Sequence, residues 1–197
     1  MKPEMITLKH GDATIKMPAS SLAKLAFAST FAVMFPPAAN VEPVAPTAIP
    51  ALGEYWPGLG GINGGHVAAR GDVPEHYLIF AASDIGEHAW GRYREESDAT
   101  SKWDGKANTD ALIAAGGHPA AEACRAYTAD GHSDFDLPAA AQLYQAWVHD
   151  LISEGVYWSS SQRSADFAFG MYFDAGCQGG NAKYDELRVR PVRRFFI

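Results

Sequence analysis

The sequence has no apolar run long enough to cross a membrane and no convincing secretion signal. A membrane-spanning helix needs about 20 consecutive apolar residues, and the apolar stretch from Leu22 to Met34 is shorter. A signal peptide would place a short basic start directly before that stretch, but residues 1–21 are mixed and include Glu4 and Asp12. We therefore expect no membrane insertion, with secretion by cleavage after Ala39 as the alternative.

Cysteine is scarce, with only Cys124 and Cys177 in 197 residues. Two cysteines do not make the disulfide framework of a small secreted domain. We expect two free thiols, and a single bridge in an oxidising compartment is the alternative.

Positive charge is also limited, since 16 basic residues face 23 acidic ones and the net charge is −7. Nucleic acid is excluded as a general partner, because phosphate binding needs a basic footprint. The chain nevertheless ends with Arg188, Arg190, Arg193 and Arg194. Their spacing among apolar residues predicts one strand over 187–195, and internal ion pairs are favoured over a basic binding patch.

Motifs for chemistry are missing as well. The seven histidines form no His-x-x-x-His pair, and there is no EF-hand pattern. A loop with His132, Asp134 and Asp136 could hold a cation, but a hydrogen-bonded loop is favoured. Ser159 to Ser161 lack a Gly-x-Ser-x-Gly elbow and are expected to support a tight turn. We expect a binding protein that is not an enzyme, with no catalytic residue, no cofactor and no metal.

What is present divides the chain into three regions. In residues 1–35, two β-prone runs flank a turn at Gly11 and predict a hairpin, followed by a helix from about Leu22. Such a piece buries too little surface to be stable alone, so it is expected to be an attachment or oligomerisation segment. The alternative is that it forms the first layer of the main domain. Residues 36–50 hold five prolines and predict a semi-rigid linker.

Residues 51–197 are expected to form one α+β domain. A β-run at 76–81 precedes helical patterns at 109–128 and 139–153, the first broken at Gly116-Gly117. From Val156 the pattern changes to period two, which is typical of strands. Helices in the middle and strands mainly at the ends predict helices packed on a twisted antiparallel sheet.

The strands after Trp158 carry more aromatic and polar side chains than a purely structural strand needs. Tyr gives large contact area at low entropic cost, and Asn, Asp and Gln give adaptable hydrogen bonds. We predict that these outward side chains bind a ligand: Asp166, Phe167, Tyr172, Gln178, Asn181, Tyr184 and Asp185. The alternative surface is the irregular segment 84–106 around Trp90, Tyr93 and Trp103.

Four motifs then occur in a fixed order: Ala120-Ala121 with Cys124, Gly131 to Pro138, Tyr157-Trp158-Ser159-Ser160, and Arg188 to Arg193. In this order they resemble the DUF1566 (Lcl C-terminal) family of C-type-lectin-like domains, and the opening at Trp56 to Ile62 resembles prophage-encoded members. The resemblance covers about three quarters of the chain. It implies a C-type-lectin-like fold whose face after Trp158 binds a partner.

The resemblance also implies a biological setting, because phage tail-fibre proteins and the variable proteins of diversity-generating retroelements use that face to bind host receptors. We therefore expect a tail-fibre tip in the virion that recognises a protein or glycan receptor on the host cell. Residues 1–35 would join it to other tail or fibre proteins, in a homotrimer. The alternative is a bacterial surface adhesin of the Lcl type, although the collagen-like repeats of that protein are missing.

Overall fold

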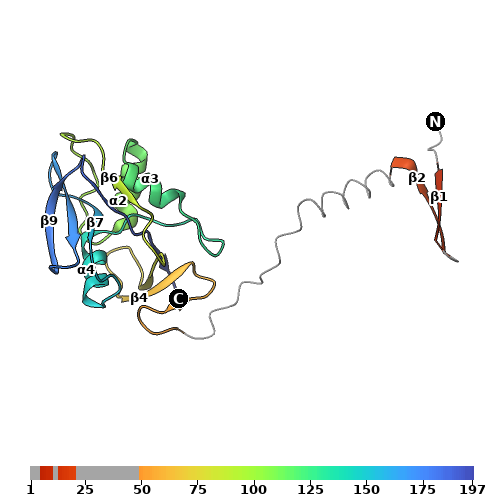
Figure 1. Ribbon diagram of the computed structural model, residues 1–197, viewed down its shortest axis with the longest axis horizontal. Coiled ribbons are helices and arrows are strands. Elements are labelled where there is room, and N and C mark those ends of the chain that lie inside the picture. Colours follow the sequence, from red (N-terminus) through yellow and green to blue (C-terminus); the bar gives the residue numbers. More distant parts are fainter. Residues whose placement is uncertain (1–4, 11–12, 21–48) are drawn as a thin grey trace. The chain divides into compact units, whose positions relative to one another are not determined.

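A computed structural model describes residues 5–10, 13–20 and 49–197 (Figure 1). The chain divides into two compact units, Met1–Val44 and Ala45–Ile197. The expected helix from Leu22 and almost all of the expected linker 36–50 lie outside the described residues. The three-part organisation and the attachment role of residues 1–35 therefore stay predictions.

The N-terminal unit contains the predicted pair of strands. β1 (Met5–His10) and β2 (Ala13–Pro18) run antiparallel, and their pairing extends from Met5 with Pro18 to His10 with Ala13. This pairing confirms the hairpin strands that the β-prone runs predict.

The C-terminal unit is α+β, as predicted, but it holds two sheets where one was expected. The first has the order β11-β5-β4-β3, is antiparallel throughout, and is built from β3 (Tyr55–Trp56), β4 (Gly61–Val67), β5 (His76–Phe80) and β11 (Val192–Phe195). The second has the order β6-β10-β7-β8-β9 and is built from β6 (Glu87–Ala89), β7 (Val156–Gln162), β8 (Phe167–Tyr172), β9 (Cys177–Ala182) and β10 (Glu186–Arg188). All its neighbours are antiparallel except β10 and β7, which pair parallel at Arg188 and Tyr157.

The expected C-terminal strand is two strands in different sheets. β10 ends at Arg188 and β11 begins at Val192, and Pro191 between them has no N–H for a ladder. Where the chain passes from one sheet to the other, the Arg190 guanidinium donates to the carbonyls of Ala81 and Ala82. The prediction of one strand over 187–195 is therefore wrong, although the chain there is mainly extended.

The internal ion pairs predicted for these arginines are confirmed at two of them. Arg193 binds Asp134 with two hydrogen bonds of 2.7 and 3.0 Å, and Arg194 pairs with Asp104. Both guanidinium groups are largely buried, so they hold the first sheet to neighbouring loops and do not form a binding patch.

In the C-terminal unit, three helices lie between β6 and β7: α2 (Gly105–Ala115), α3 (Pro119–Ala126) and α4 (Ala140–Val148). The break at Gly116-Gly117 is as predicted, and α3 begins at Pro119, a residue that suits the first turn of a helix. The predicted start at 109 is four residues late, because Asp104 caps α2 by accepting from the Ala107 N–H. Among the described residues, no helix is long and apolar enough to cross a membrane.

Helix α4 ends five residues before the predicted end at 153. Asp150 adopts a left-handed backbone (φ +52°), and the Leu151 N–H donates back to the Ala146 carbonyl. This is a Schellman ending with aspartate in the place that glycine usually takes. No glycine follows until Gly155, so the sequence carries no ordinary stop signal there.

Strand β4 was not predicted because it is rich in glycine, which is rare in strands. Here glycine is needed for close packing on β5. A Cβ atom added at Gly61 would lie 2.1 Å from the Phe80 carbonyl oxygen, and one at Gly64 would lie 2.6 Å from the Phe80 ring. The first sheet therefore depends on contacts that only the partner strand reveals.

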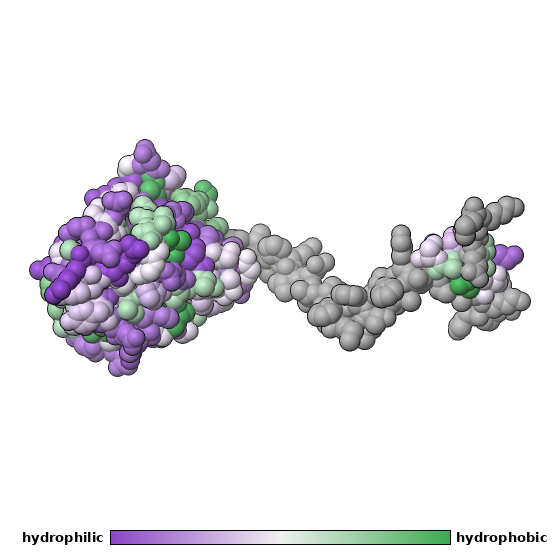
Figure 2. Space-filling model, turned by 90° about the horizontal axis from the view of Figure 1, so that it is seen from above, coloured by the Kyte–Doolittle hydropathy of each residue, from purple (hydrophilic) through white to green (hydrophobic). Residues whose placement is uncertain are grey.

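The core lies between the helices and the two sheets. α2 packs against β7, α3 against β6, and α4 against β7 and β8 (Figure 1). One buried cluster centres on Trp90, Leu112 and Trp158, and another on Phe80, Leu143 and Met171. On the face seen in Figure 2, apolar side chains form small separate patches among hydrophilic ones.

Candidate binding surface

The seven predicted ligand-binding residues lie on β8, on the edge strand β9, and in the turns beside them. Tyr184 is the most exposed aromatic among them at 62%, and Phe167 is 43% exposed. Gln178 is exposed, whereas Asp166, Tyr172, Asn181 and Asp185 are half-buried. Only part of the predicted set therefore faces solvent freely.

Tyr172 and Asn181 form a contact within the domain. The Tyr172 hydroxyl donates to Asn181 Oδ1 across β8 and β9. A Cβ atom added at Gly179 would lie 2.9 Å from the Tyr172 ring, so the glycine makes room for it. This pair stiffens the sheet edge, because the Tyr172 hydroxyl and the Asn181 amide oxygen bind each other.

Gln178 and Asp185 also bind the backbone. Gln178 Nε2 donates to the Ala140 carbonyl at 2.6 Å and ties β9 to the start of α4. Asp185 Oδ2 accepts from the Ala182 N–H at 3.0 Å and closes the turn that presents Tyr184. These two side chains therefore hold β9 and the turn at Tyr184 in place, and their hydrogen-bonding groups are used within the domain.

The structure brings the predicted surface and its alternative together at two tyrosines. The Tyr93 and Tyr184 rings are 4.9 Å apart and nearly perpendicular, and Tyr93 is 38% exposed. Three loops meet there, which we call the loop cluster: residues 91–96, 163–166 and 183–185. Backbone hydrogen bonds of 2.9–3.0 Å join Gly91 to Lys183, Arg94 to Ala165, and Lys183 to Asp166.

The buried side chain of Lys183 holds the loop cluster in place. Its side chain is fully buried, and Nζ donates to the Glu95 carbonyl at 2.6 Å and to Gln162 Oε1 at 2.7 Å. The ammonium also lies 4.6 Å from the centre of the Trp90 ring. Burial lowers the pKa of Lys183, so the loops are fixed by a cation that water does not solvate.

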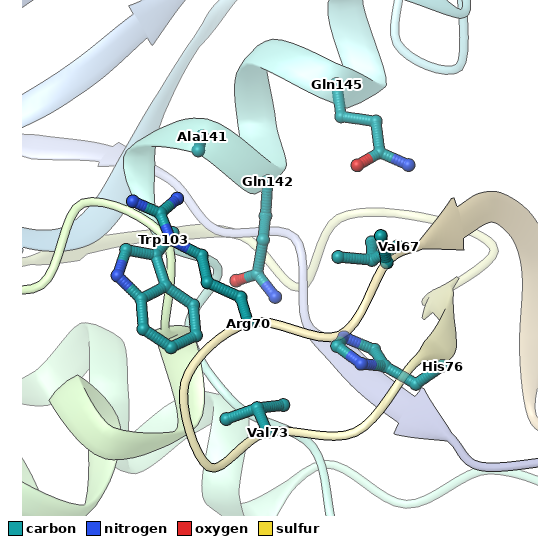
Figure 3. Close-up of a pocket in the computed structure, with 9 residues that line it drawn as sticks. Val67, Arg70, Val73, His76, Trp103, Ala141, Gln142 and Gln145 are labelled. Carbon is teal, nitrogen blue, oxygen red and sulfur yellow. The ribbon is translucent and has the colours of Figure 1, made fainter.

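The other two aromatic residues of the alternative surface have different surroundings. Trp90 is fully buried, and its indole N–H donates to the Ser159 carbonyl at 2.9 Å, so it belongs to the core. Trp103 lies beside a separate cavity (Figure 3). Of the three aromatics named for segment 84–106, only Tyr93 joins the loop cluster.

The three serines after Trp158 lie inside β7 and are buried, so the predicted tight turn is wrong. Ser159 Oγ donates to the Phe169 carbonyl, Ser160 Oγ accepts from Asn108 Nδ2, and Ser161 Oγ donates to the Ser101 carbonyl. Their pairing with β8 is interrupted between Trp158 and Gln162. The hydroxyls satisfy backbone and amide groups that this irregular strand leaves inside the domain.

Cys124 and Cys177 are both free, as favoured from the sequence; Cys124 is buried and Cys177 is exposed. In the loop considered for a cation, Asp134 binds Arg193 and Asp136 binds Arg125. Within residues 5–10, 13–20 and 49–197, no three His, Cys, Asp or Glu side chains are grouped to hold a metal ion.

No protein-family model matches the sequence, and no curated protein matches it.

Proposed function

We propose that the C-terminal unit is a C-type-lectin-like receptor-binding domain of a phage or prophage tail-fibre tip, and that the loop cluster is its receptor-binding surface. Four motifs in family order support the fold, together with an α+β domain whose first and last strands share one sheet. The receptor is a protein or glycan of the host-cell surface, and residues 1–35 join the tip to the rest of the fibre as a homotrimer.

The observation that carries this proposal is the exposed Tyr93–Tyr184 pair on loops that the buried Lys183 side chain holds in place. Exposed aromatic side chains that are already ordered lose little entropy on binding, and Tyr is enriched among the residues that dominate binding energy. Lys183 and the three backbone hydrogen bonds supply that order.

Polar side chains around the pair suit a specific partner. Arg94 lies over the Tyr93 ring, with its guanidinium carbon 5.2 Å from the ring centre. Arg92 pairs with Glu95 at the surface. Charges of both signs around an aromatic centre form the polar rim that protein and glycan interfaces commonly have.

The test is adsorption of the fluorescently labelled full chain to a panel of bacterial strains, measured by flow cytometry. We expect Tyr93→Ala together with Tyr184→Ala to weaken binding at least about 30-fold, since one aromatic anchor is worth about 2 kcal/mol. The melting temperature should stay within about 2 °C, because neither ring is part of the buried core; Tyr93 is 38% and Tyr184 62% exposed.

Tyr144→Ala is the matched control. Tyr144 is 47% exposed on α4 and lies against Trp147, so it presents a similar aromatic pair elsewhere on the unit. If this variant loses adsorption as strongly as the double variant, the receptor is not bound at the loop cluster. If no strain adsorbs the unchanged chain, the receptor-binding function itself is refuted.

The second candidate is a bacterial surface adhesin of the Lcl type, which the same motifs favour. The two differ in where the chain is found. Purified virions that contain the chain support the tail-fibre tip, whereas surface-labelled bacteria that display it without virions support the adhesin. Light scattering tests the trimer, and a stable monomer would contradict that part of the proposal.

A further inference from the structure

A second candidate site lies beside the start of α4, in a cavity of about 130 Å³ (Figure 3). It is lined by Val67, Ala68, Arg70, Val73, His76, Trp103, Ala141, Gln142 and Gln145. Drug-sized ligands need about 300 Å³ or more, but a cavity of about 150 Å³ can hold benzene. The space therefore suits a group of about six or seven heavy atoms.

One hydrogen-bond donor is fixed inside this cavity. The Gln142 side chain is only 6% exposed, and its Oε1 accepts from the Ala139 N–H at 2.7 Å. That bond orients the amide so that its NH₂ group is left for the cavity, where Figure 3 places it. No described residue accepts a hydrogen bond from this NH₂ group, so a ligand acceptor would satisfy it.

A cation without a carboxylate partner borders the same space. The Arg70 side chain extends past the Gln142 amide to Trp103, and its guanidinium carbon lies 4.8 Å from the centre of that ring (Figure 3). Among the described residues, no carboxylate lies within ion-pair distance of Arg70. Guanidinium groups bind carboxylates with charge-assisted hydrogen bonds, so this side of the cavity favours an anion.

Two hydrogen-bond acceptors, on His76 and Gln145, also line the cavity. His76 Nδ1 lies 2.8 Å from the Pro74 carbonyl, so Nδ1 carries the proton and Nε2 is the free acceptor. Burial lowers the pKa of His76, which keeps the ring neutral at pH 7. Gln145 Nε2 donates to the Gly64 carbonyl at 2.9 Å, which leaves Oε1 as an acceptor. Acceptors of this kind suit a hydroxyl donor.

We propose that this cavity binds a small 2-hydroxycarboxylate, either a free hydroxy acid or the acidic end of an open-chain sugar acid, which carries a hydroxyl on the carbon next to its carboxylate. Arg70 and the Gln142 amide bind the carboxylate, His76 or Gln145 accepts from the hydroxyl, and the carbon atoms pack on Val67 and Val73. The inference is independent of the proposed function, because the cavity and the loop cluster share no residue.

Saturation-transfer NMR on the full chain tests the proposal, with lactate, propionate, lactamide and gluconate titrated separately. We expect lactate or gluconate to saturate. Lactamide, which lacks the charge, should bind at least about 10-fold more weakly than lactate, and propionate, which lacks the hydroxyl, at least about 3-fold more weakly. Tighter binding of gluconate identifies a sugar acid as the source, and binding of lactate alone identifies a small free hydroxy acid.

Three variants localise the binding. Arg70→Met should weaken it at least about 10-fold, whereas Lys106→Met, which removes one exposed cation on α2, should leave it unchanged. Gln142→Glu keeps an oxygen for the Ala139 N–H but replaces the donor by a second acceptor, so binding should be lost while the melting temperature is retained. The proposal is overturned if neither acid saturates, if lactamide or propionate matches lactate, or if Arg70→Met and Lys106→Met behave alike.

Discussion

Lys183→Met is expected to destabilise the C-terminal unit through the loop cluster. Methionine keeps the length of the side chain but removes the ammonium, so the Glu95 carbonyl and Gln162 Oε1 each lose a donor. A hydrogen bond to a charged group contributes about 1.5–3 kcal/mol, so the two together contribute about 3–6 kcal/mol. Removing the ammonium also removes its desolvation cost, which offsets part of that sum. We expect a net loss of about 2 kcal/mol.

Lys102→Met is the matched control, because Lys102 Nζ also binds Gln162, at its carbonyl, with a 2.9 Å hydrogen bond. Its ammonium also lies over an aromatic ring, 4.0 Å from the centre of Phe169, but the residue is exposed. Because water competes for this exposed ammonium, its hydrogen bond contributes less, about 0.5–1 kcal/mol. The two variants therefore make the same chemical change in a buried and an exposed setting.

Thermal unfolding followed by circular dichroism measures the difference. For a unit of this size, 1 kcal/mol shifts the melting temperature by about 3 °C, so we expect losses of about 6 °C for Lys183→Met and about 2 °C for Lys102→Met. If the two melt within about 1 °C of each other, the buried hydrogen bonds of Lys183 do not stabilise the loop cluster as argued.

Comparing Lys183→Met with the unchanged protein tests the sign of a pH effect. Because burial lowers the folded-state pKa of Lys183 below its ordinary 10.5, the unfolded chain binds more protons between those two values. This group therefore makes stability rise with pH across that window. The rise should be smaller in Lys183→Met, and a rise of the same size in both proteins would show that Lys183 is not the group responsible.

Two further predictions concern aspartates of the unit. Asp150 and Asp130 both have left-handed backbones (φ +52° and +48°), but Asp130 Oδ2 also accepts from the Tyr55 hydroxyl and from the Gly58 and Gly60 N–H groups. In urea unfolding, Asp150→Gly should therefore stabilise the unit by about 0.5–1 kcal/mol, whereas Asp130→Gly should destabilise it by about 2 kcal/mol. Effects of the same sign in the two variants would contradict this. Burial raises the pKa of Asp136 from 3.8 to about 6, so its contribution to stability is present at low pH and is lost as pH rises through about 6. Relative to Asp136→Asn, the unchanged protein should lose stability between about pH 4 and pH 6, and parallel curves would refute the assignment.

Local signals in the sequence determined several elements. The hairpin strands, the run at 76–81, the glycine stop of α2 and the proline start of α3 all depend on residues within a few positions of each other. The order of helical and alternating patterns was enough for the α+β class. The charge balance also predicted internal pairs for the terminal arginines, since carboxylates outnumber cations in the chain.

Only tertiary structure decided the features that depend on distant partners. The glycines of β4 are needed because Phe80 of the neighbouring strand approaches them. Likewise, Trp90 looks like a surface aromatic in an irregular segment until β7 covers it.

The candidate surface shows the same division. From the sequence, Tyr184 and Tyr93 belong to a first choice and an alternative, separated by three helices and three strands. Backbone hydrogen bonds and the buried Lys183 place their rings 4.9 Å apart. Composition and alternation can indicate which side chains are suited to binding, because those are properties of single residues. Which of them meet is set by loop closure and core packing, which no local pattern encodes.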